Sequence, residues 1–429
     1  MSAIVPNNYA TSSPLQPAQS RLRTQSANTE TTFPQECLVG TIGEFAKFMA
    51  ADSEVPEEFY FAAGLTFLGH VCGANIRLAN SLDVRPQLYT VLLGDSGEVK
   101  KSTAMRKTRE FFESLGLDNL PQLSLGVGSA EGLAKNLSSH QDLLLAYDEL
   151  RSFIDKCGVQ TSVLLPMVTS LYEQTGYQNT TKSSNVVVND AHLSLLGCCT
   201  SDTYADMWTP AAISIGLPNR LFVVKGDARS RVAWPKPKPE AEMARLRDLV
   251  KSQVPTGPTD FSISPEGSEL WTRWYESRPR SVHATRLDTI GFRLMGLLAV
   301  TMDKGEIDSA VVSVVTKILD YEYRVRVATD PINADNKIAG LEQKIRNALS
   351  LNRNCWVPER ELRQKTHADR TGLFYFNCAL KNLATISGEI ESKKERGKLL
   401  YRLAHEDEDV AVSSPVASPS INVNIHMIQ

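Results

Sequence analysis

The sequence of 429 residues predicts an α/β fold in which a parallel β-sheet carries helices on both faces. Between residues 86 and 228, short apolar runs of strand length alternate with helical patterns. One run ends in a glycine-bearing turn that leads into a helix, and another ends in two adjacent carboxylates. Strands that alternate with helices in this way pair in parallel, because each crossover returns the chain to the same edge of the sheet.

Composition places the chain among globular proteins of two or three domains, since 42% of its residues are apolar and 22% are charged. The formal net charge of −3 means that any surface for nucleic acid has to be local. The seven cysteines are scattered without a metal-ligand spacing, which is typical of a reducing compartment, so we expect a cytoplasmic protein. No apolar run has the length of a membrane span or the pattern of a signal peptide, and we expect no membrane partner.

The balance of polar and apolar residues divides the chain into segments. Both ends are rich in small polar residues and predict disordered tails. Apolar residues at helical spacing predict a helical segment ahead of the α/β core, and a proline-dotted stretch after the core predicts a linker that continues into a helical lid. A compact unit follows the lid. The expected segments are 1–34, 35–85, 86–228, 229–333, 334–404 and 405–429.

Within these segments, apolar spacing predicts the individual elements. Strands are expected at 86–93, 143–147, 186–188, 192–198 and 220–224. Helices are expected within 39–74 and at 102–115, 270–276, 286–301 and 309–327. The last of these helices has its apolar residues in phase along one face, which is typical of a helix packed on a core.

The stretch after the first strand predicts a site for a nucleoside triphosphate. The apolar run ends at Leu93, a turn with two glycines follows, and a lysine and two hydroxyl residues then begin a helix. This is the order of a P-loop, in which backbone N–H groups cradle phosphate, the lysine neutralises its charge and the hydroxyl binds Mg²⁺. We therefore expect ATP and Mg²⁺ to bind here. The expected binding residues are Gly94, Asp95, Ser96, Gly97, Glu98, Val99, Lys100, Lys101, Ser102 and Thr103.

The register of this motif has two solutions. Counting from Gly94 at the usual spacing makes Lys100 the phosphate-binding lysine, but Lys101 follows it and has no hydroxyl for the metal. Taking Lys101 and Ser102 as the functional pair restores the hydroxyl, lengthens the loop by one residue and puts Lys100 where glycine normally stands. We prefer this second register, because metal binding fixes the residue type more tightly than the loop length. A surface turn ahead of an ordinary basic helix is the alternative.

Asp148 and Glu149 follow the buried run at 143–147. At the end of a strand near the phosphate loop, Asp148 could join Ser102 in holding Mg²⁺, and Glu149 could polarise the attacking water. Two acidic residues are also common in the first turn of a helix, where they complement its dipole. The spacing from the phosphate loop favours the catalytic interpretation.

Two further polar residues are candidates for contact with nucleotide. In ring-forming ATPases a polar residue at the place of Thr200, with Ser201 as the fallback, contacts the γ-phosphate or the lytic water; the alternative is a helix N-cap at Ser201 or Asp202. Arg220 begins the last core strand and could reach the γ-phosphate of a neighbouring subunit, although an arginine at a strand edge is usually solvated. Weaker candidates are Arg286 and Arg293 for a lid arginine, and Arg229 and Arg231 if Arg220 is structural.

The C-terminal unit has the pattern of a winged-helix domain. Three expected helices, at 337–349, from 357 and at 373–384, precede a hairpin between 388 and 403. Residues 335–404 hold fourteen lysines and arginines against eight acidic residues. The cluster on the hairpin predicts contact with DNA phosphates; the alternatives are a protein-contact surface and a solvated turn. The expected DNA-binding residues are Lys393, Lys394, Arg396 and Lys398.

Taken in order, these motifs resemble those of a known family. The matching pieces, within residues 40–330, are 94–97, 101–103, 147–149, 195–200, 216–220 and 286–300. They resemble the P-loop ATPases of phages, prophages and plasmids that are encoded beside or fused to primases, and that are related to replicative helicases of superfamily 3 and the AAA+ class. The resemblance implies a RecA/AAA+-like P-loop core and ATP hydrolysis coupled to DNA. It also implies a homo-oligomer, such as a hexameric ring, and a primase in a separate chain.

Two classes of function follow. The first expectation is a DNA helicase of a mobile element's replication machinery, with Lys101, Asp148, Glu149, Thr200 and Arg220 as its catalytic residues. The alternative is an ATP-gated DNA-binding switch or loader, such as a transposition or defence regulator, which does not unwind DNA. A third possibility is a non-enzymatic DNA-binding regulator with a degenerate P-loop. The lysine in place of the usual glycine makes ATP binding the firmer expectation and hydrolysis the weaker one.

Overall fold

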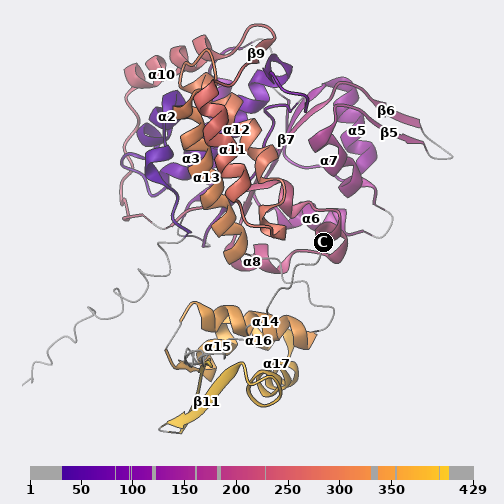
Figure 1. The fold of residues 1–429 in the computed structure, drawn as a ribbon, viewed down its shortest axis with the longest axis vertical. Coiled ribbons are helices and arrows are strands. Elements are labelled where there is room, and N and C mark those ends of the chain that lie inside the picture. The colour runs from indigo at the N-terminus through magenta and orange to yellow at the C-terminus, as the bar shows by residue number, and fades with distance from the viewer. Residues whose placement is uncertain are drawn as a thin grey trace, which may run out of the picture. The chain divides into compact units, whose positions relative to one another are not determined.

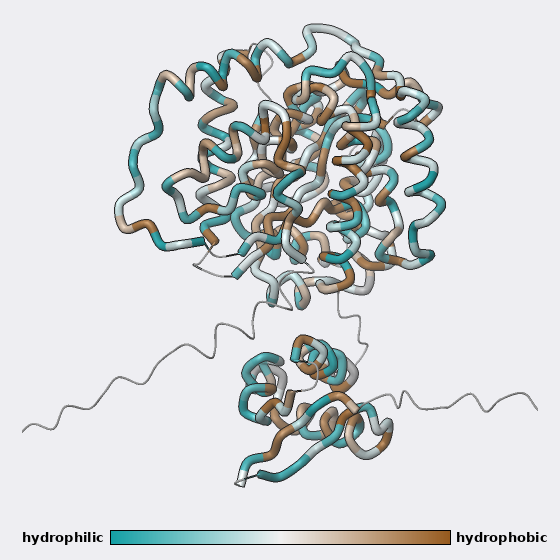
Figure 2. Tube along the Cα trace, turned by 60° about the vertical axis from the view of Figure 1, so that its left-hand side comes forward, coloured by the Kyte–Doolittle hydropathy of each residue, from teal (hydrophilic) through white to brown (hydrophobic). Residues whose placement is uncertain are grey.

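The computed structural model of the chain describes residues 31–82, 84–95, 97, 99–117, 122–159, 162–180, 185–227, 229–329, 337–352, 355–395 and 397–404. The chain divides into two compact units, Met1–Asn333 and Ala334–Gln429 (Figure 1). Each unit has a hydrophobic core of its own. Apolar segments gather inside the units and polar segments lie on their outer faces (Figure 2).

A five-stranded sheet forms the centre of the larger unit, and all its strand pairs are parallel. The spatial order is β3-β4-β7-β2-β8, so β2 lies between β7 and β8. β2 and β7 are buried along their whole length, as expected for a parallel sheet with both faces covered. The predicted α/β class with a parallel sheet is confirmed. The bounds are β2 Tyr89–Leu93, β3 Gln122–Ser124, β4 Asp142–Tyr147, β7 His192–Cys199 and β8 Leu221–Lys225.

Helices cover both faces of this sheet, and neighbouring residues of β2 show it. The Thr90 hydroxyl lies 2.7 Å from that of Thr66 in α3, whereas the Tyr89 hydroxyl donates to the Val168 carbonyl of α7 at 2.9 Å. Successive side chains of a strand point to opposite faces, so α3 and α7 lie on opposite sides of the sheet. The helices of these two layers include α2 Gly40–Ala50, α3 Glu57–Cys72, α4 Lys101–Glu113, α5 Ala130–Ser139 and α7 Leu164–Glu173.

Helix α13 (Ser309–Ala328) packs along the edge strand β8. Glu322 accepts a hydrogen bond from the Val223 backbone N–H at 2.9 Å, and the Tyr321 hydroxyl accepts one from the Lys225 N–H at 2.7 Å. Arg326 donates to Glu322 and to the carbonyl of Leu221. These buried side chains take up backbone groups that an edge strand otherwise leaves unpaired.

The remaining elements of the larger unit surround these layers. A short parallel pair, β1 and β9, joins the N-terminal helices to the region after the sheet, and β5 and β6 form an antiparallel hairpin ahead of β7. Their bounds are η2 Gln35–Cys37, η3 Gly73–Asn75, β1 Ile76–Leu78, α6 Arg151–Cys157, β5 Tyr177–Thr180, β6 Asn185–Val188, α8 Ser201–Asp206, α9 Pro210–Ser214, η4 Pro218–Arg220, α10 Glu240–Gln253, β9 Thr259–Phe261, α11 Pro265–Ser277, η5 Val282–Ala284 and α12 Leu287–Thr301.

Two sequence predictions are wrong in this unit, and one predicted strand lies outside the central sheet. The expected disordered tail extends too far, because Phe33 is buried against Phe61 and Tyr321. The run at 186–188 is a strand, as predicted, but it pairs with β5 in a hairpin, and the edge strand β3 of the central sheet was not predicted. Helix α10 lies within the stretch that we expected to be a linker. Its sequence is rich in Ala, Glu, Leu and Arg, which are strong helix formers, and the neighbouring prolines masked this signal.

The smaller unit contains helices and a three-stranded antiparallel sheet in the order β10-β12-β11. Leu341 and Ile345 of its first helix pack with Leu362, Phe376 and Leu380. The long hairpin β11–β12 closes the unit. The bounds are α14 Lys337–Ser350, β10 Val357–Pro358, α15 Glu359–Lys365, α16 Ala368–Thr371, α17 Leu373–Lys381, η6 Asn382–Ile386, β11 Ile390–Glu395 and β12 Lys398–Leu403.

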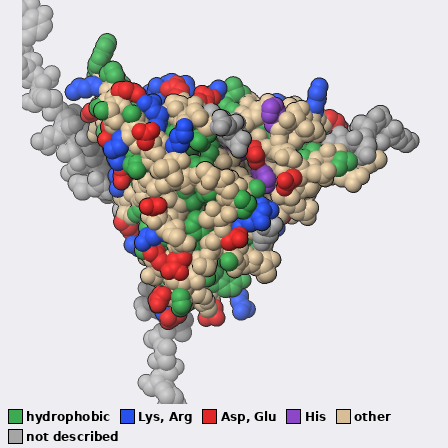
Figure 3. Space-filling view, turned by 90° about the horizontal axis from the view of Figure 1, so that it is seen from above, with side chains coloured by type: hydrophobic (Ala, Val, Ile, Leu, Met, Phe, Trp, Pro, Cys, Tyr) green, Lys and Arg blue, Asp and Glu red, His purple; other side chains and the backbone are tan. Residues whose placement is uncertain are grey.

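On the face drawn in Figure 3, acidic and basic side chains are interspersed, in keeping with the small net charge. Among the described residues, no helix combines the length and the apolar character that a bilayer crossing requires.

Candidate functional site

Three of the predicted loops meet at one edge of the central sheet. The β2–α4 loop holds residues 94–100, the loop after β4 holds the acidic pair 148–149, and β7 ends directly before Thr200. β4, β7 and β2 are neighbours, and the carboxyl ends of parallel strands lie at the same edge. The register makes β2 and β7 end level with each other, because Leu93 is paired with Cys199. Segments far apart in the sequence are thereby brought together.

The neighbouring strands β2 and β7 are followed by connections that run in opposite directions across the sheet. The connection after β2 leads to β3 at one end of the sheet, whereas the connection after β7 leads to β8 at the other end. Because crossovers are right-handed, these two connections leave on opposite faces of the sheet. Open α/β sheets bind their ligands at such a switch point, beyond the carboxyl ends of the strands.

Lys101 is the first residue of α4, and its side chain turns back over the preceding loop. Its Nζ donates hydrogen bonds to the carbonyl oxygens of Gly94, at 2.7 Å, and Asp95, at 3.1 Å. Partial burial lowers the pKa of this ammonium group, against the opposing effects of Cys198, Asp95 and Glu149. Lys100 supplies no side-chain cap to helix α4, and a helix N-terminus favours an anion. An ammonium and a helix N-terminus therefore lie at the same loop.

Lys100 precedes α4 in the left-handed backbone conformation, with φ 42° and ψ 41°. Glycine adopts this conformation without the steric cost of a Cβ atom, and the P-loop pattern has glycine directly before its lysine. The conformation at Lys100 therefore favours the register in which Lys101 is the functional lysine. Counting back from Lys101 at the usual spacing places Asp95, rather than Gly94, where the first glycine of the pattern stands. The Lys100 ammonium lies 3.6 Å from the carboxylate of Glu54.

The other loop residues have distinct surroundings. Gly94 is closely packed, since a Cβ atom there would lie 2.6 Å from the Val99 side chain and 2.9 Å from the Gly226 carbonyl oxygen. Gly97 has a φ of 76°, which also favours glycine. Ser102 is exposed at the start of α4 and Thr103 is half-buried. The predicted binding residues Ser96 and Glu98 lie outside the described residues.

Asp148 and Glu149 are both exposed in the tight connection between β4 and α6. The N–H of the next residue, Leu150, donates to the Cys198 carbonyl at 2.9 Å and ties this connection to β7. The carboxylate of Glu149 lies 3.9 Å from the Cys199 thiol, at the end of the strand beside β2. Burial raises the pKa of both Cys198 and Cys199 to about 12, so these thiols are neutral neighbours of the acidic pair.

Thr200 caps helix α8. Its hydroxyl accepts a hydrogen bond from the Thr203 N–H at 3.2 Å and donates to the Thr203 hydroxyl at 2.8 Å. The alternative prediction of an N-cap at Ser201 or Asp202 is therefore wrong by one residue or two. Contact between Thr200 and a ligand requires its hydroxyl to turn away from Thr203, because a hydroxyl has a single proton to donate.

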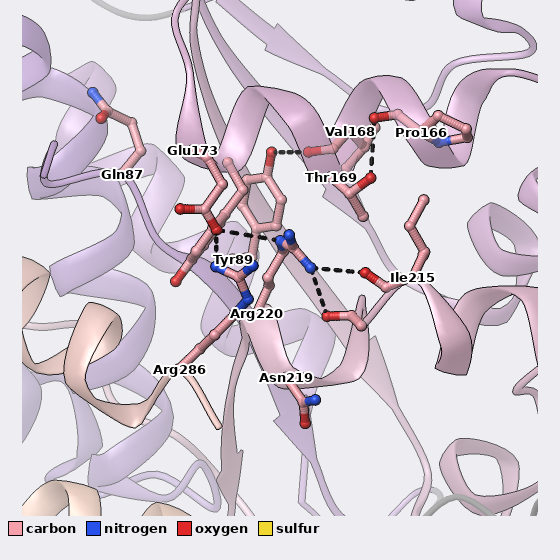
Figure 4. Close-up of polar contacts among 12 residues, drawn as sticks. Gln87, Tyr89, Pro166, Val168, Thr169, Glu173, Ile215, Asn219, Arg220 and Arg286 are labelled. Atoms are coloured by element: carbon pink, nitrogen blue, oxygen red, sulfur yellow. Dashed lines mark hydrogen bonds and ion pairs between the residues drawn. The ribbon is translucent and has the colours of Figure 1, made fainter. Parts of the chain in front are cut away.

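Arg220 lies at the opposite edge of the sheet from the β2–α4 loop. The next residue, Leu221, is paired with Tyr89, the first residue of β2. Figure 4 shows the guanidinium group held from several sides. It donates to the carbonyls of Ile215 and Gly216 at 3.0 and 2.9 Å, and its Nε lies 3.5 Å from the Glu173 carboxylate. Arg220 is buried, and burial lowers its pKa. Within this protomer its contacts are structural.

The alternative arginines occupy three different places. Arg286 pairs with Glu173 beside Arg220 and keeps 31% of its side chain exposed (Figure 4). Arg293 is buried and donates to the Gln87 carbonyl just ahead of β2, so neither residue is near the carboxyl edge, where a lid arginine of the same subunit is needed. Arg229 donates hydrogen bonds to the backbone carbonyls of Ala50 and Val55, at the two ends of the α2–α3 loop, and Arg231 is exposed.

A strap, defined here as residues 229–239, runs from the end of β8 over the α2–α3 loop at 51–56. Arg229 donates to Ala50 and Val55, and the Val232 N–H donates to Glu54 at 3.1 Å. Lys238 donates to the Ala51 carbonyl. These contacts fix the strap beside the start of α4.

Between the strap, the α2–α3 loop and α4 lies a cavity of about 770 Å³, named the strap cavity below. Lys100 and Thr103 line it where it borders the β2–α4 loop, and Tyr60 and Phe111 contribute aromatic surface. Trp234 belongs to the strap and is 84% exposed, between lining residues Val232 and Pro235. The sequence contains the proline-lysine alternation of the strap but gives no sign of where it packs.

The predicted basic residues of the smaller unit differ in their contacts. Lys393 pairs with Glu395 at 2.7 Å and lies over the Trp356 ring. Lys394 and Lys398 are exposed and line a cavity of about 800 Å³ against α15. Arg360 and Arg363 of α15 line the same cavity and were missing from the sequence-based prediction. Arg396 lies outside the described residues.

The chain was compared with known protein families and with curated proteins, and neither comparison finds a match.

Proposed function

We propose that the larger unit binds and hydrolyses ATP at a P-loop formed by the β2–α4 loop and the start of α4. One observation carries this proposal: the Lys101 ammonium, the uncapped start of α4 and the acidic pair Asp148 and Glu149 lie at the same edge of the sheet. A polyphosphate needs cations and N–H donors, and a metal-assisted hydrolysis needs carboxylates nearby. The five-stranded parallel sheet is compatible with this class of core.

Each residue has a role in this proposal. Lys101 binds the phosphates, and the backbone of residues 94–103 surrounds them. The donor set fits Mg²⁺, since Ser102 and Asp148 offer exposed oxygen ligands of the kind this hard cation prefers. When bound, the metal neutralises phosphate charge. Glu149 orients and polarises the attacking water, and its carboxylate, 3.9 Å from the end of β7, lies on the side of the site toward Thr200.

The strap cavity supports this interpretation. It borders the β2–α4 loop at Lys100 and Thr103, and its volume of about 770 Å³ is ample for a nucleoside. Tyr60 and Phe111 offer the apolar and aromatic surface that a purine requires. In this proposal the base lies under the strap, close to Trp234.

The smaller unit acts as a winged-helix DNA-binding domain in the same proposal. Helices α14, α15 and α17, the short strand β10 ahead of α15 and the hairpin β11–β12 support this proposal, because a helix-turn-helix with a wing has elements of these kinds in this order. Among the basic hairpin residues that the sequence predicted and the structure describes, Lys394 and Lys398 are exposed and available to phosphates. We further propose a DNA helicase of a mobile element that works as an oligomer with a separate primase, in the cytoplasm.

A second function, an ATP-gated switch or loader, is favoured by Lys100. A lysine in the left-handed conformation costs about 1 kcal/mol or more relative to glycine, directly beside the phosphates. Such strain could favour binding and release of nucleotide over rapid turnover. In that case the chain assembles on DNA without unwinding it.

One experiment separates these functions: the rate of ATP hydrolysis with and without single- and double-stranded DNA, together with the mass in solution. Turnover that DNA stimulates, with strand separation, supports the helicase. Turnover without strand separation supports the switch. Absence of ATP binding by a folded chain contradicts both.

A further inference from the structure

The carboxylate of Glu54 contacts two segments of the candidate site at once. Its Oε1 accepts a hydrogen bond from the Val232 N–H of the strap at 3.1 Å, and its Oε2 lies 3.6 Å from the Lys100 ammonium in the β2–α4 loop. Glu54 belongs to the α2–α3 loop, and its side chain is 25% exposed. All three residues line the strap cavity. One side chain therefore links the strap to the loop that we propose binds phosphates.

The strap has little apolar burial to hold it in place. Residues 229–239, all of which the structure describes, form no helix or strand, and each of them is exposed or half-buried. Hydrogen bonds of Arg229, Val232 and Lys238 attach the strap to the α2–α3 loop and its flanks. Segments with few buried apolar contacts open at a low free-energy cost. Loss of the contact at Val232 should therefore shift the strap toward an open form.

The lining of the strap cavity favours an uncharged aromatic occupant. Several of its cations are already paired with its own carboxylates, at Lys100 with Glu54, Lys107 with Glu110, and Arg247 with Glu240. Tyr60, Phe111 and two prolines of the strap add aromatic and apolar surface. A nucleobase is a planar, uncharged group that suits such a lining. The cavity borders the β2–α4 loop, so the triphosphate of the same molecule would lie on that side.

We propose that Glu54 is a positioning residue for the nucleoside part of ATP, because it holds the strap over the cavity in which the base lies. This inference rests on the proposed function, since it requires ATP at the β2–α4 loop. It assigns the residue through which the site distinguishes a nucleotide from triphosphate alone. The hydrogen bond from Val232 carries the effect, because a ligand binds more tightly when its binding-competent form is already populated. The half-exposed ion pair with Lys100 contributes little.

The test compares the affinities of the full chain for ATP and for inorganic triphosphate, both with Mg²⁺, by titration calorimetry. Glu54→Ala removes the acceptor and should weaken ATP binding about tenfold, the factor that corresponds to one hydrogen bond to a charged group. Binding of triphosphate, which has no base to place in the cavity, should change much less. Glu54→Gln keeps an oxygen acceptor for the Val232 N–H and should retain the wild-type ratio of the two affinities.

Glu113→Ala is the matched control for the removal of a carboxylate. Glu113 is an exposed residue of α4, and its carboxylate pairs with Arg109. It does not line the strap cavity. This variant should bind both ligands as the wild type does.

Trypsin gives a second readout of the strap. It cleaves after lysine and arginine except where proline follows, so Lys236 and Lys238, each followed by a proline, are resistant. Cleavage after Arg229 and Arg231, identified by the masses of the fragments, then reports the population of the open strap. Glu54→Ala should be cleaved faster at these bonds than the wild type. ATP should protect them more than triphosphate does.

Four outcomes overturn the inference. An unchanged ratio of the two affinities in Glu54→Ala shows that Glu54 does not position the nucleoside, and an equal loss for both ligands shows that it acts on the phosphate loop alone. A ratio in Glu54→Gln as low as that in Glu54→Ala assigns the effect to charge. A wild type that binds ATP no more tightly than triphosphate places the base elsewhere. In all four cases the chain still binds triphosphate. If the folded wild type binds neither ligand, the proposed function itself fails and this inference fails with it.

Discussion

The Lys101 ammonium lies 2.7 Å from the carbonyl oxygen of Gly94, so the first residue of α4 closes the loop that precedes it. In the proposed site a phosphate replaces these carbonyl contacts. Lys101→Ala should lower ATP affinity by at least about tenfold, since a hydrogen bond to a charged group contributes about 1.5–3 kcal/mol. Titration calorimetry measures this. Lys100→Ala is the matched control and should bind nearly as the wild type does; the opposite ranking of the two variants would assign the function to Lys100.

Lys100→Gly should stabilise the chain by about 1 kcal/mol, because the left-handed conformation at this position carries a steric cost for every residue with a Cβ atom. Loss of the half-exposed ion pair with Glu54 offsets little of this gain. Denaturant unfolding of the two proteins gives the difference. A destabilised glycine variant with unchanged nucleotide affinity would show that the ion pair outweighs the strain.

Glu149→Gln should retain ATP binding and reduce hydrolysis by about 10²- to 10⁴-fold, the usual contribution of a general base. Glutamine keeps the size of the side chain and removes its capacity to take a proton. The comparison needs binding and turnover on the same preparation, with Glu131→Gln, an exposed residue of α5, as the control. Turnover at the wild-type rate would place the base elsewhere.

Arg220→Ala should destabilise the isolated chain by about 2 kcal/mol, because the change leaves the carbonyls of Ile215 and Gly216 without their buried partner. The measurement is urea unfolding at a concentration where the chain is monomeric. Arg231→Ala removes an exposed arginine and should have no effect. If Arg220→Ala is as stable as the wild type and reduces only the ATP hydrolysis of the assembled oligomer, the result would support contact between Arg220 and the γ-phosphate of a neighbouring subunit.

Burial raises the pKa of Glu58, in the first turn of α3, to about 7. The folded chain then holds a proton that the unfolded chain, with its ordinary pKa of 4.5, releases, so stability falls as the pH rises from about 4.5 to about 7. Glu58→Gln should remove this loss and stabilise the chain above pH 7 by up to about 3 kcal/mol, with no advantage near pH 4. Thermal unfolding across this range measures the effect, with the more exposed Glu57→Gln as control. If the stability of the variant and that of the wild type depend on pH in the same way, Glu58 does not hold this proton in the folded chain.

The strands and helices that the sequence predicted correctly are those with strong local periodicity. Apolar runs placed β2, β4, β7 and β8 within a few residues, and 3.6-residue spacing placed α12 and α13. The run at 186–188 is a strand as predicted, but it pairs in a hairpin outside the central sheet, because the length of an apolar run does not say which partner it will pair with. The short strand β3 was not predicted. The same limit applies to Phe33, whose aromatic partners lie in α3 and α13.

For the candidate site, the sequence alone determined which residue types follow each strand: a lysine with hydroxyls after β2, two carboxylates after β4, a threonine after β7. Tertiary structure decided the rest. Strand order put these three at one edge and Arg220 at the other, the backbone conformation of Lys100 favours Lys101 as the functional lysine, and folding of the strap created the cavity beside them. Pairing order and cavity shape depend on contacts between residues far apart in the chain, and no local pattern of side chains encodes them.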